Sequence, residues 1–138
     1  MKPSGLLIVA LFPSAMCPEI LRADPIRRAE RLETLAIDAE TGFSVDRYEL
    51  QAGTYYRWRI ATDGRDTYTI LAQELFAESW IDKVTMEDVE MRVSGLHALT
   101  FEDESEVDLW FVPLRIGSYT YAAEGLEALG FSGDVIVK

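Results

Sequence analysis

The sequence predicts a single all-β domain, an antiparallel sandwich with one short helical segment. Short β-prone segments of alternating apolar and polar residues recur through residues 32–138, separated by turn signals about every eight to twelve residues. No long helical pattern interleaves them, which disfavours a parallel α/β sheet. A chain of 138 residues fits one domain and can bury a core without disulfides or a metal.

The strongest strand signal lies between Tyr55 and Ile60, where aromatic residues alternate with arginines. In an extended strand, Trp58 faces one side while Arg57 and Arg59 face the other. Turn residues, Asp63 and Gly64, end this strand. The same alternation between turn signals predicts the remaining strands. They are expected at residues 32–37, 43–50, 67–71, 84–93, 96–100, 107–114, 119–121 and 135–137.

Residues 73–80 break the strand pattern, because apolar residues recur there at helical spacing. We therefore expect one or two helical turns. A helix would also place Glu74, Glu78 and Asp82 on one face. Such a face could bind a hard cation through its carboxylates, or it could simply be a solvated surface.

The N-terminus has the pattern of a secretory signal. Lys2 precedes the short apolar stretch 6–12, and prolines follow it, so residues 1–23 are expected to act as a targeting segment. Cleavage after Ala23 would remove that segment, and an uncleaved anchor is the alternative. No apolar run reaches the 18 residues or so of a standard transmembrane helix.

The targeting segment at residues 1–23 determines how we interpret Cys17, the linker and the location of the protein. Cys17 is either a lipid-attachment residue or an ordinary thiol that leaves with the signal. Residues 24–31 are expected to form a linker or arm, and residues 32–138 the domain. The predicted location is the periplasm or another exported compartment.

The net negative charge of the chain limits which classes of molecule it is expected to bind. The chain has 13 Lys and Arg against 24 Asp and Glu, a formal net charge of −11. Phosphates of nucleic acid and of anionic lipid would repel such a protein, so neither is an expected partner. The charge suits a basic protein surface or a metal cation, or it serves only solubility.

The last third of the chain carries a distinctive spacing. The stretch Ile116–Leu126 is followed after three residues by Gly130–Gly133 and then by a final strand, Asp134–Lys138. This spacing resembles the hairpin through which cupredoxins bind copper, with Tyr119 on a framework position. The resemblance covers residues 43–138 and implies a cupredoxin-like Greek-key β-sandwich, similar to the periplasmic domains of metal-uptake and respiratory accessory proteins.

The copper-binding positions of that family hold other residues here. The resemblance places Ala123 at the thiolate position, Tyr68 and Leu126 at the two imidazole positions and Phe131 at the axial position. A type 1 copper site needs a thiolate and two imidazoles. The resemblance therefore implies a degenerate cupredoxin with no copper at this site, and no cofactor is expected.

These observations predict a non-enzymatic accessory module that docks to a protein, such as a subunit of a membrane-bound redox or transport complex. No serine has a plausible histidine base, so nucleophilic catalysis lacks support. Direct membrane contact is expected only if the N-terminal segment is retained. The candidate partner surface comprises Trp80, Leu126, Phe131, Glu102, Asp103, Glu104 and Glu106.

Metal handling is the alternative function. His97, the only histidine, could join Met86, Met91 and carboxylates in a weak copper or iron site. Each group also has a structural interpretation. The histidine would be an ordinary strand residue, the methionines would fill the core, and the acids at 102–106 would form a charged hairpin turn.

Overall fold

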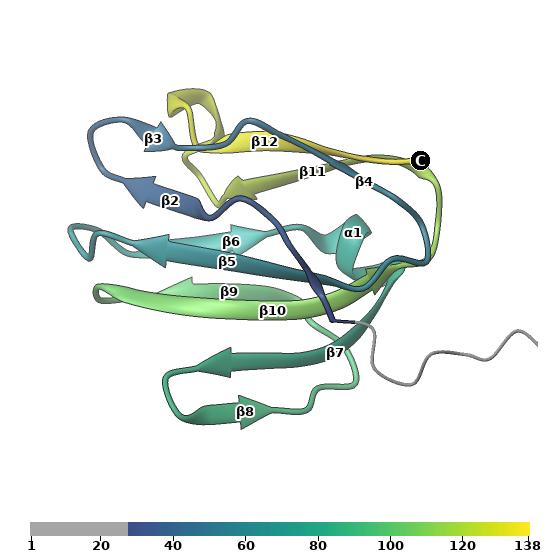
Figure 1. The fold of residues 1–138 in the computed structure, drawn as a ribbon. Coiled ribbons are helices and arrows are strands. Elements are labelled where there is room, and N and C mark those ends of the chain that lie inside the picture. The colour runs from purple at the N-terminus through teal and green to yellow at the C-terminus, as the bar shows by residue number, and fades with distance from the viewer. Residues whose placement is uncertain (1–27) are drawn as a thin grey trace, which may run out of the picture.

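In the computed structural model, residues 28–138 are described. The predicted targeting segment 1–23, with Cys17, lies outside them. The described chain folds into two facing β-sheets (Figure 1). Its elements are β1 (Glu30–Arg31), β2 (Leu35–Asp38), β3 (Gly42–Phe43), β4 (Arg47–Leu50), β5 (Tyr56–Thr62), β6 (Tyr68–Leu71), α1 (Gln73–Ala77), β7 (Ser79–Met86), β8 (Val89–Met91), β9 (Ala98–Phe101), β10 (Ser105–Pro113), β11 (Gly117–Ala123), the 3₁₀ turn η1 (Glu127–Leu129) and β12 (Ser132–Val137).

The sandwich prediction is confirmed, with one difference in strand direction. The first sheet has the order β3-β2-β5-β10-β7-β8, with β1 also on β5, and the second has the order β4-β12-β11-β6-β9. Most pairs are antiparallel, but β1 and β2 pair with β5 in parallel, as β4 does with β12, so both sheets are mixed. Residue alternation reports which face a side chain occupies but carries no information about strand direction.

The alternation predicted for the arginine-rich strand is present in β5. Trp58 and Ile60 are buried in the core, whereas Arg57 and Arg59 lie on the outer face of the first sheet. Leu109 of β10 pairs directly with Trp58 and is also fully buried. Strands β5 and β10 thus form the centre of the first sheet, with one apolar and one charged face.

The helical segment is shorter than predicted. The helix α1 ends at Ala77, and Ser79 already begins β7, where its hydroxyl donates to the Leu75 carbonyl (2.6 Å). Asp82 therefore belongs to a strand, and the predicted carboxylate face of Glu74, Glu78 and Asp82 was wrong. The pairing of β7 with β10 overrides the short helical pattern.

The expectation that two methionines fill the core was also wrong. Met86 and Met91 are 40% and 39% exposed. They lie in the β7–β8 hairpin, and β8 forms the edge of the first sheet. His97 is exposed and precedes β9 instead of lying within a strand, with its Nε2 3.4 Å from the Gln73 amide nitrogen. Within residues 28–138, no helix is long and apolar enough to cross a membrane.

Candidate functional site at the loop end

Besides the β7–β8 turn, four connections lie at one end of the sandwich, on the left of Figure 1, and we call the region that these four form the loop end. They are the turn 39–41 between β2 and β3, the turn 63–67 between β5 and β6, the turn 102–104 between β9 and β10, and the segment 124–131 between β11 and β12. The loop end contains the positions that the sequence resemblance associates with copper.

The interior of the loop end is packed with aromatic rings. Tyr68 and Phe131 are 1% and 6% exposed, and their rings stack with centroids 5.8 Å apart. Phe43 meets the Phe131 ring edge-on at 5.7 Å. Ala123 is fully buried beside them and bonds through its backbone N–H to the Phe131 carbonyl. The volume that a metal and its ligands would need is therefore occupied by the core.

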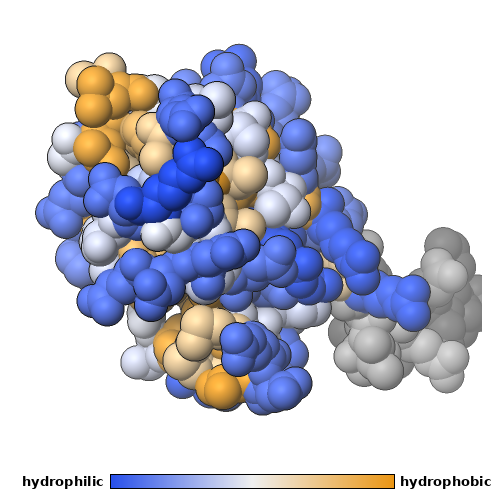
Figure 2. All heavy atoms as spheres, turned by 90° about the vertical axis from the view of Figure 1, so that its left-hand side faces the viewer, coloured by the Kyte–Doolittle hydropathy of each residue, from blue (hydrophilic) through white to orange (hydrophobic). Residues whose placement is uncertain are grey.

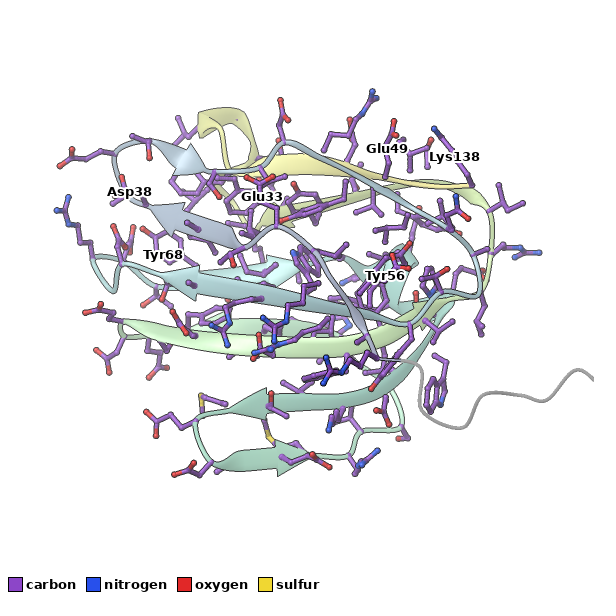
Figure 3. All side chains as sticks on the ribbon, in the orientation of Figure 1. Glu33, Asp38, Glu49, Tyr56, Tyr68 and Lys138 are labelled. Atoms are coloured by element: carbon purple, nitrogen blue, oxygen red, sulfur yellow. The ribbon has the colours of Figure 1, made fainter. Side chains whose placement is uncertain are left out.

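The one polar atom among these side chains is already bonded. The Tyr68 hydroxyl donates to Asp63 Oδ1 (3.3 Å). Burial, reinforced by the nearby Asp63 carboxylate, raises the pKa of Tyr68, so the phenol stays protonated at neutral pH. Figure 3 shows Tyr68 in the strand that follows the 63–67 turn. A protonated phenol bonded to a carboxylate is a poor ligand for a cation.

Asp63 itself holds two turns of the loop end together. Its Oδ2 accepts from the Ala39 backbone N–H (2.9 Å), and its Oδ1 accepts from the Arg65 backbone N–H (3.1 Å). The bond from Ala39 is the main cause that lowers the pKa of Asp63. This carboxylate is therefore a structural group that connects the 39–41 turn to the 63–67 turn.

The longest loop is anchored at its base and exposed at its tip. Gly130, with φ +89°, accepts at its carbonyl from the Phe43 backbone N–H (3.1 Å), which ties the loop to β3. Leu126 is partly buried against the core, whereas Leu129 is 69% exposed. No sequence pattern predicts an exposed leucine here, because a 3₁₀ turn of three residues is too short to show a periodicity.

Acidic side chains cover the middle of the loop end. Glu102, Asp103 and Glu104 are exposed and form no ion pair with any residue of 28–138. Glu106 lies within β10 instead, where it pairs with Arg59 (3.3 Å). Figure 2 shows a hydrophilic band across this end, with hydrophobic patches above and below it.

The structure separates the residues of the predicted partner surface. Leu126 and the 102–104 acids lie at the loop end, but Phe131 is buried and offers little surface. Trp80, 53% exposed, pairs with Val112 near the far end of β10 and therefore lies at the opposite end of the sandwich. The antiparallel pairing of β7 with β10 causes this separation, because β10 begins at the loop end.

The donors of the alternative metal site are also dispersed. Among residues 28–138, no group of three or more His, Cys, Asp or Glu side chains is arranged to hold a metal. His97 precedes β9 at the α1 end of the sandwich, next to Gln73, whereas Met86 ends β7 at the β7–β8 turn. The sulfur and imidazole groups are thus on different parts of the fold.

Comparison with solved structures identifies the fold. The chain is similar to a multicopper oxidase from Campylobacter jejuni described as a metallo-oxidase (TM-score 0.57, 11% identity, 83% of this chain and 31% of that one). It is also similar to a copper nitrite reductase from Nitrosomonas europaea (TM-score 0.62, 10% identity, 86% of this chain and 52% of that one). A third similar structure is dithionite-reduced auracyanin from Roseiflexus castenholzii (TM-score 0.52, 10% identity, 76% of this chain and 94% of that one).

These similarities confirm a cupredoxin-like β-sandwich. The chain spans 31% and 52% of the oxidase and the nitrite reductase, but it corresponds to nearly all of auracyanin. Identities of 10–11% show a shared fold and leave function to the site itself. No protein-family model and no curated protein matches the chain.

Proposed function

We propose that this chain is a non-enzymatic, exported binding module with a cupredoxin-like scaffold, no type 1 copper and a loop end that docks a basic protein surface. The observation that carries the proposal is the aromatic packing of Tyr68 and Phe131, two positions that the resemblance associates with copper, beneath acids that form no ion pair within residues 28–138. A partner within a membrane-bound redox or transport complex fits this role. The exported location rests on the sequence of residues 1–23.

Electrostatics supports the loop end as the docking surface. The exposed carboxylates of Glu102, Asp103 and Glu104 project from a turn that the fold fixes on both sides. Gly64 of the neighbouring turn lies so close to the Glu104 backbone that a Cβ there would clash with it. A cluster of like charges on a fixed turn increases the rate and specificity of association with an oppositely charged surface.

The docking proposal is tested by charge reversal. The triple variant Glu102→Lys, Asp103→Lys, Glu104→Lys should lose a membrane-protein partner that the unmodified chain captures from solubilised membranes. The control Glu30→Lys, Glu33→Lys, Glu74→Lys makes the same change in net charge at exposed acids elsewhere and should retain it. Capture should also weaken between low and physiological salt. Equal capture by both triple variants would place the docking surface away from the loop end.

The assignment of the copper positions has its own test. The unmodified protein should develop no intense blue colour with Cu(II). Installing donors at all four positions (Tyr68→His, Ala123→Cys, Leu126→His, Phe131→Met) should produce the absorption of a thiolate–copper centre. The same protein without the Ala123→Cys change should stay colourless. A folded quadruple variant that never turns blue would show that these positions do not converge as assigned.

The metal-handling alternative gains no support from the geometry, because its donors do not converge in residues 28–138. Calorimetry with Cu(I), Cu(II), Fe(II) and Ca²⁺ separates the two functions. Stoichiometric micromolar binding that disappears in a His97→Ala or Met91→Leu variant would favour metal handling over docking.

A further inference from the structure

A small cavity opens on the outer face of the first sheet, away from the loop-end turns. It has a volume of about 270 Å³ and is lined by Arg31, Leu32, Thr34, Arg57 and Arg59. Three of these five lining residues are arginines, and none is acidic. Figure 3 shows nitrogen-tipped side chains crossing the front of β5 and β10 on this face.

The strand pairing explains why a cavity forms here. β1 pairs with β5 at Tyr56 and Arg57, and β2 pairs with β5 again only from Ile60. Between these contacts the chain leaves the sheet, so Trp58 and Arg59 have no register partner on this side. Arg31 is in register with Arg57, and side chains in register on adjacent strands share a face. Arg31 of β1 and Arg57 of β5 therefore lie on one face beside the gap in the sheet edge, where both line the cavity.

Among residues 28–138, acids pair with two of the three arginines that line the cavity. Asp108 accepts from Arg57 Nη2 (2.5 Å) and from Arg59 Nε (2.9 Å), and Glu106 pairs with Arg59 (3.3 Å). Arg31 forms no ion pair with any residue of 28–138. Arg31 thus contributes a guanidinium charge to the cavity that the ion pairs of Arg57 and Arg59 do not offset, in a protein whose net charge is −11.

Donor capacity also remains unused at this site. Arg57 bonds to Asp108 through Nη2, and no hydrogen bond within residues 28–138 uses its Nη1. Thr34 also lines the cavity, and its hydroxyl is a further possible donor. A guanidinium group binds carboxylate and phosphate oxygens in a two-pronged geometry that no neutral ligand matches.

We propose that this cavity is a binding site for a small oxyanion, a carboxylate or a phosphate, held by Arg31 and Arg57 with Thr34. Among residues 28–138, no acidic residue lines the cavity, which disfavours a cation, and only Leu32 supplies an apolar side chain, which disfavours an apolar ligand. The proposal does not depend on docking at the loop end, because it uses other residues on another face of the molecule.

Nuclear magnetic resonance titration of the full chain tests the proposal. Inorganic phosphate and acetate are titrated separately at constant ionic strength with chloride as the balancing anion. We expect saturable shifts of the amide signals of residues 31–34 and 57–59. Arg31→Gln should weaken binding by about tenfold or more, as loss of a charge-assisted hydrogen bond does. Because Arg31 is exposed, this replacement should not disturb folding.

The control is Arg115→Gln, which removes an exposed arginine that pairs with Glu78 and should leave binding unchanged. Saturation by phosphate alone, or by acetate alone, identifies which oxyanion the site prefers. The proposal is overturned if shifts grow without saturating, if they spread over the whole surface, or if a folded Arg31→Gln variant binds as tightly as the unmodified protein.

Discussion

Phe131, at a position that the cupredoxin resemblance associates with a copper ligand, is part of the core. It lies between Tyr68 and Phe43, with ring centroids 5.8 and 5.7 Å away, and is 6% exposed. Close packing of this kind gains dispersion contacts that a vacated site would lose. At the residue scale, the packing of Phe131 against Tyr68 and Phe43 therefore stabilises the loop end.

Replacing Phe131 with alanine tests this role. Phe131→Ala should lower the free energy of unfolding by about 3–5 kcal/mol, the usual cost of removing a buried phenyl ring. Leu129→Ala, at a 69% exposed position in the same loop, should change it by less than about 0.5 kcal/mol. Urea unfolding monitored by tryptophan fluorescence measures both. Similar losses for the two variants would show that the ring is not packed as described.

Asp108 is the charged counterpart on the outer face. Burial raises the pKa of Asp108, but the hydrogen bonds from Arg59 and Arg57 outweigh burial and leave its pKa below the ordinary value of 3.8. A carboxyl whose folded pKa is depressed stabilises the protein above its unfolded pKa. That stabilisation is lost as pH falls below about 3.8 toward the folded pKa.

The Asp108→Asn variant should therefore have a pH-dependent cost. At pH 7 we expect it to lower the free energy of unfolding by about 1–3 kcal/mol, because two arginines lose a charged acceptor. The difference from the unmodified protein should shrink as pH falls below about 4. Urea unfolding from pH 7 to pH 3 measures this, with Asp103→Asn as the exposed control. A difference independent of pH would exclude the ion pairs as its source.

At the scale of elements, the loop end depends on close contact between turns that are distant in sequence. The 63–67 turn packs against the 102–104 turn at Gly64, which has φ +69° and no room for a Cβ beside the Glu104 backbone. Gly53 also has a positive φ, +81°, but nothing lies within 4 Å of its Cβ position. Comparing substitutions at the two glycines therefore distinguishes the cost of a left-handed backbone from the cost of a steric clash.

Alanine substitution at these glycines should have unequal effects. Gly53→Ala should cost about 1–2 kcal/mol, for the left-handed backbone alone. Gly64→Ala should cost about 1–3 kcal/mol more, because the added methyl group must push two turns apart. Thermal unfolding of both variants gives the comparison. Equal losses of stability would mean that the 63–67 and 102–104 turns do not touch as the structure shows.

For the whole molecule, the arrangement of strands determines which parts resist local opening and hydrogen exchange. β5, β10 and β11 have neighbours on both sides, whereas β8 and β9 are edge strands. The exposed Met86, Val89 and Met91 show that the β7–β8 hairpin extends beyond the apolar core. Local opening should therefore begin at the β8 edge and involve the central strands last.

Hydrogen exchange tests this gradient. Amides of β5 and β10 should exchange slowest, at rates set by global unfolding, and amides of Val89–Met91 should exchange fastest among the strands. Exchange measured by mass spectrometry at neutral pH gives the order. Uniform protection across the first sheet would indicate that a partner chain or a second copy covers the β8 edge.

Sequence reasoning succeeded where local pattern and global fold agree, and failed where they conflict. The alternation around Trp58 predicts both the strand and its buried face, and both are confirmed. The helical spacing around Trp80 predicts a helix where β7 forms, because pairing with β10 outweighs a short local preference. The apolar character of Met86 and Met91 predicts burial, but burial depends on whether the opposite sheet reaches that far.

The sequence alone determined the all-β class, the acidic charge, and the hydrocarbon and phenol side chains at the positions that the cupredoxin resemblance associates with copper. These follow from residue types and short-range periodicity, which a linear chain displays directly. Only the tertiary structure decided which residues meet. It separated Trp80 from the loop end and brought Arg31 beside Arg57 at a gap in the sheet edge, because strand direction and register are set by long-range pairing.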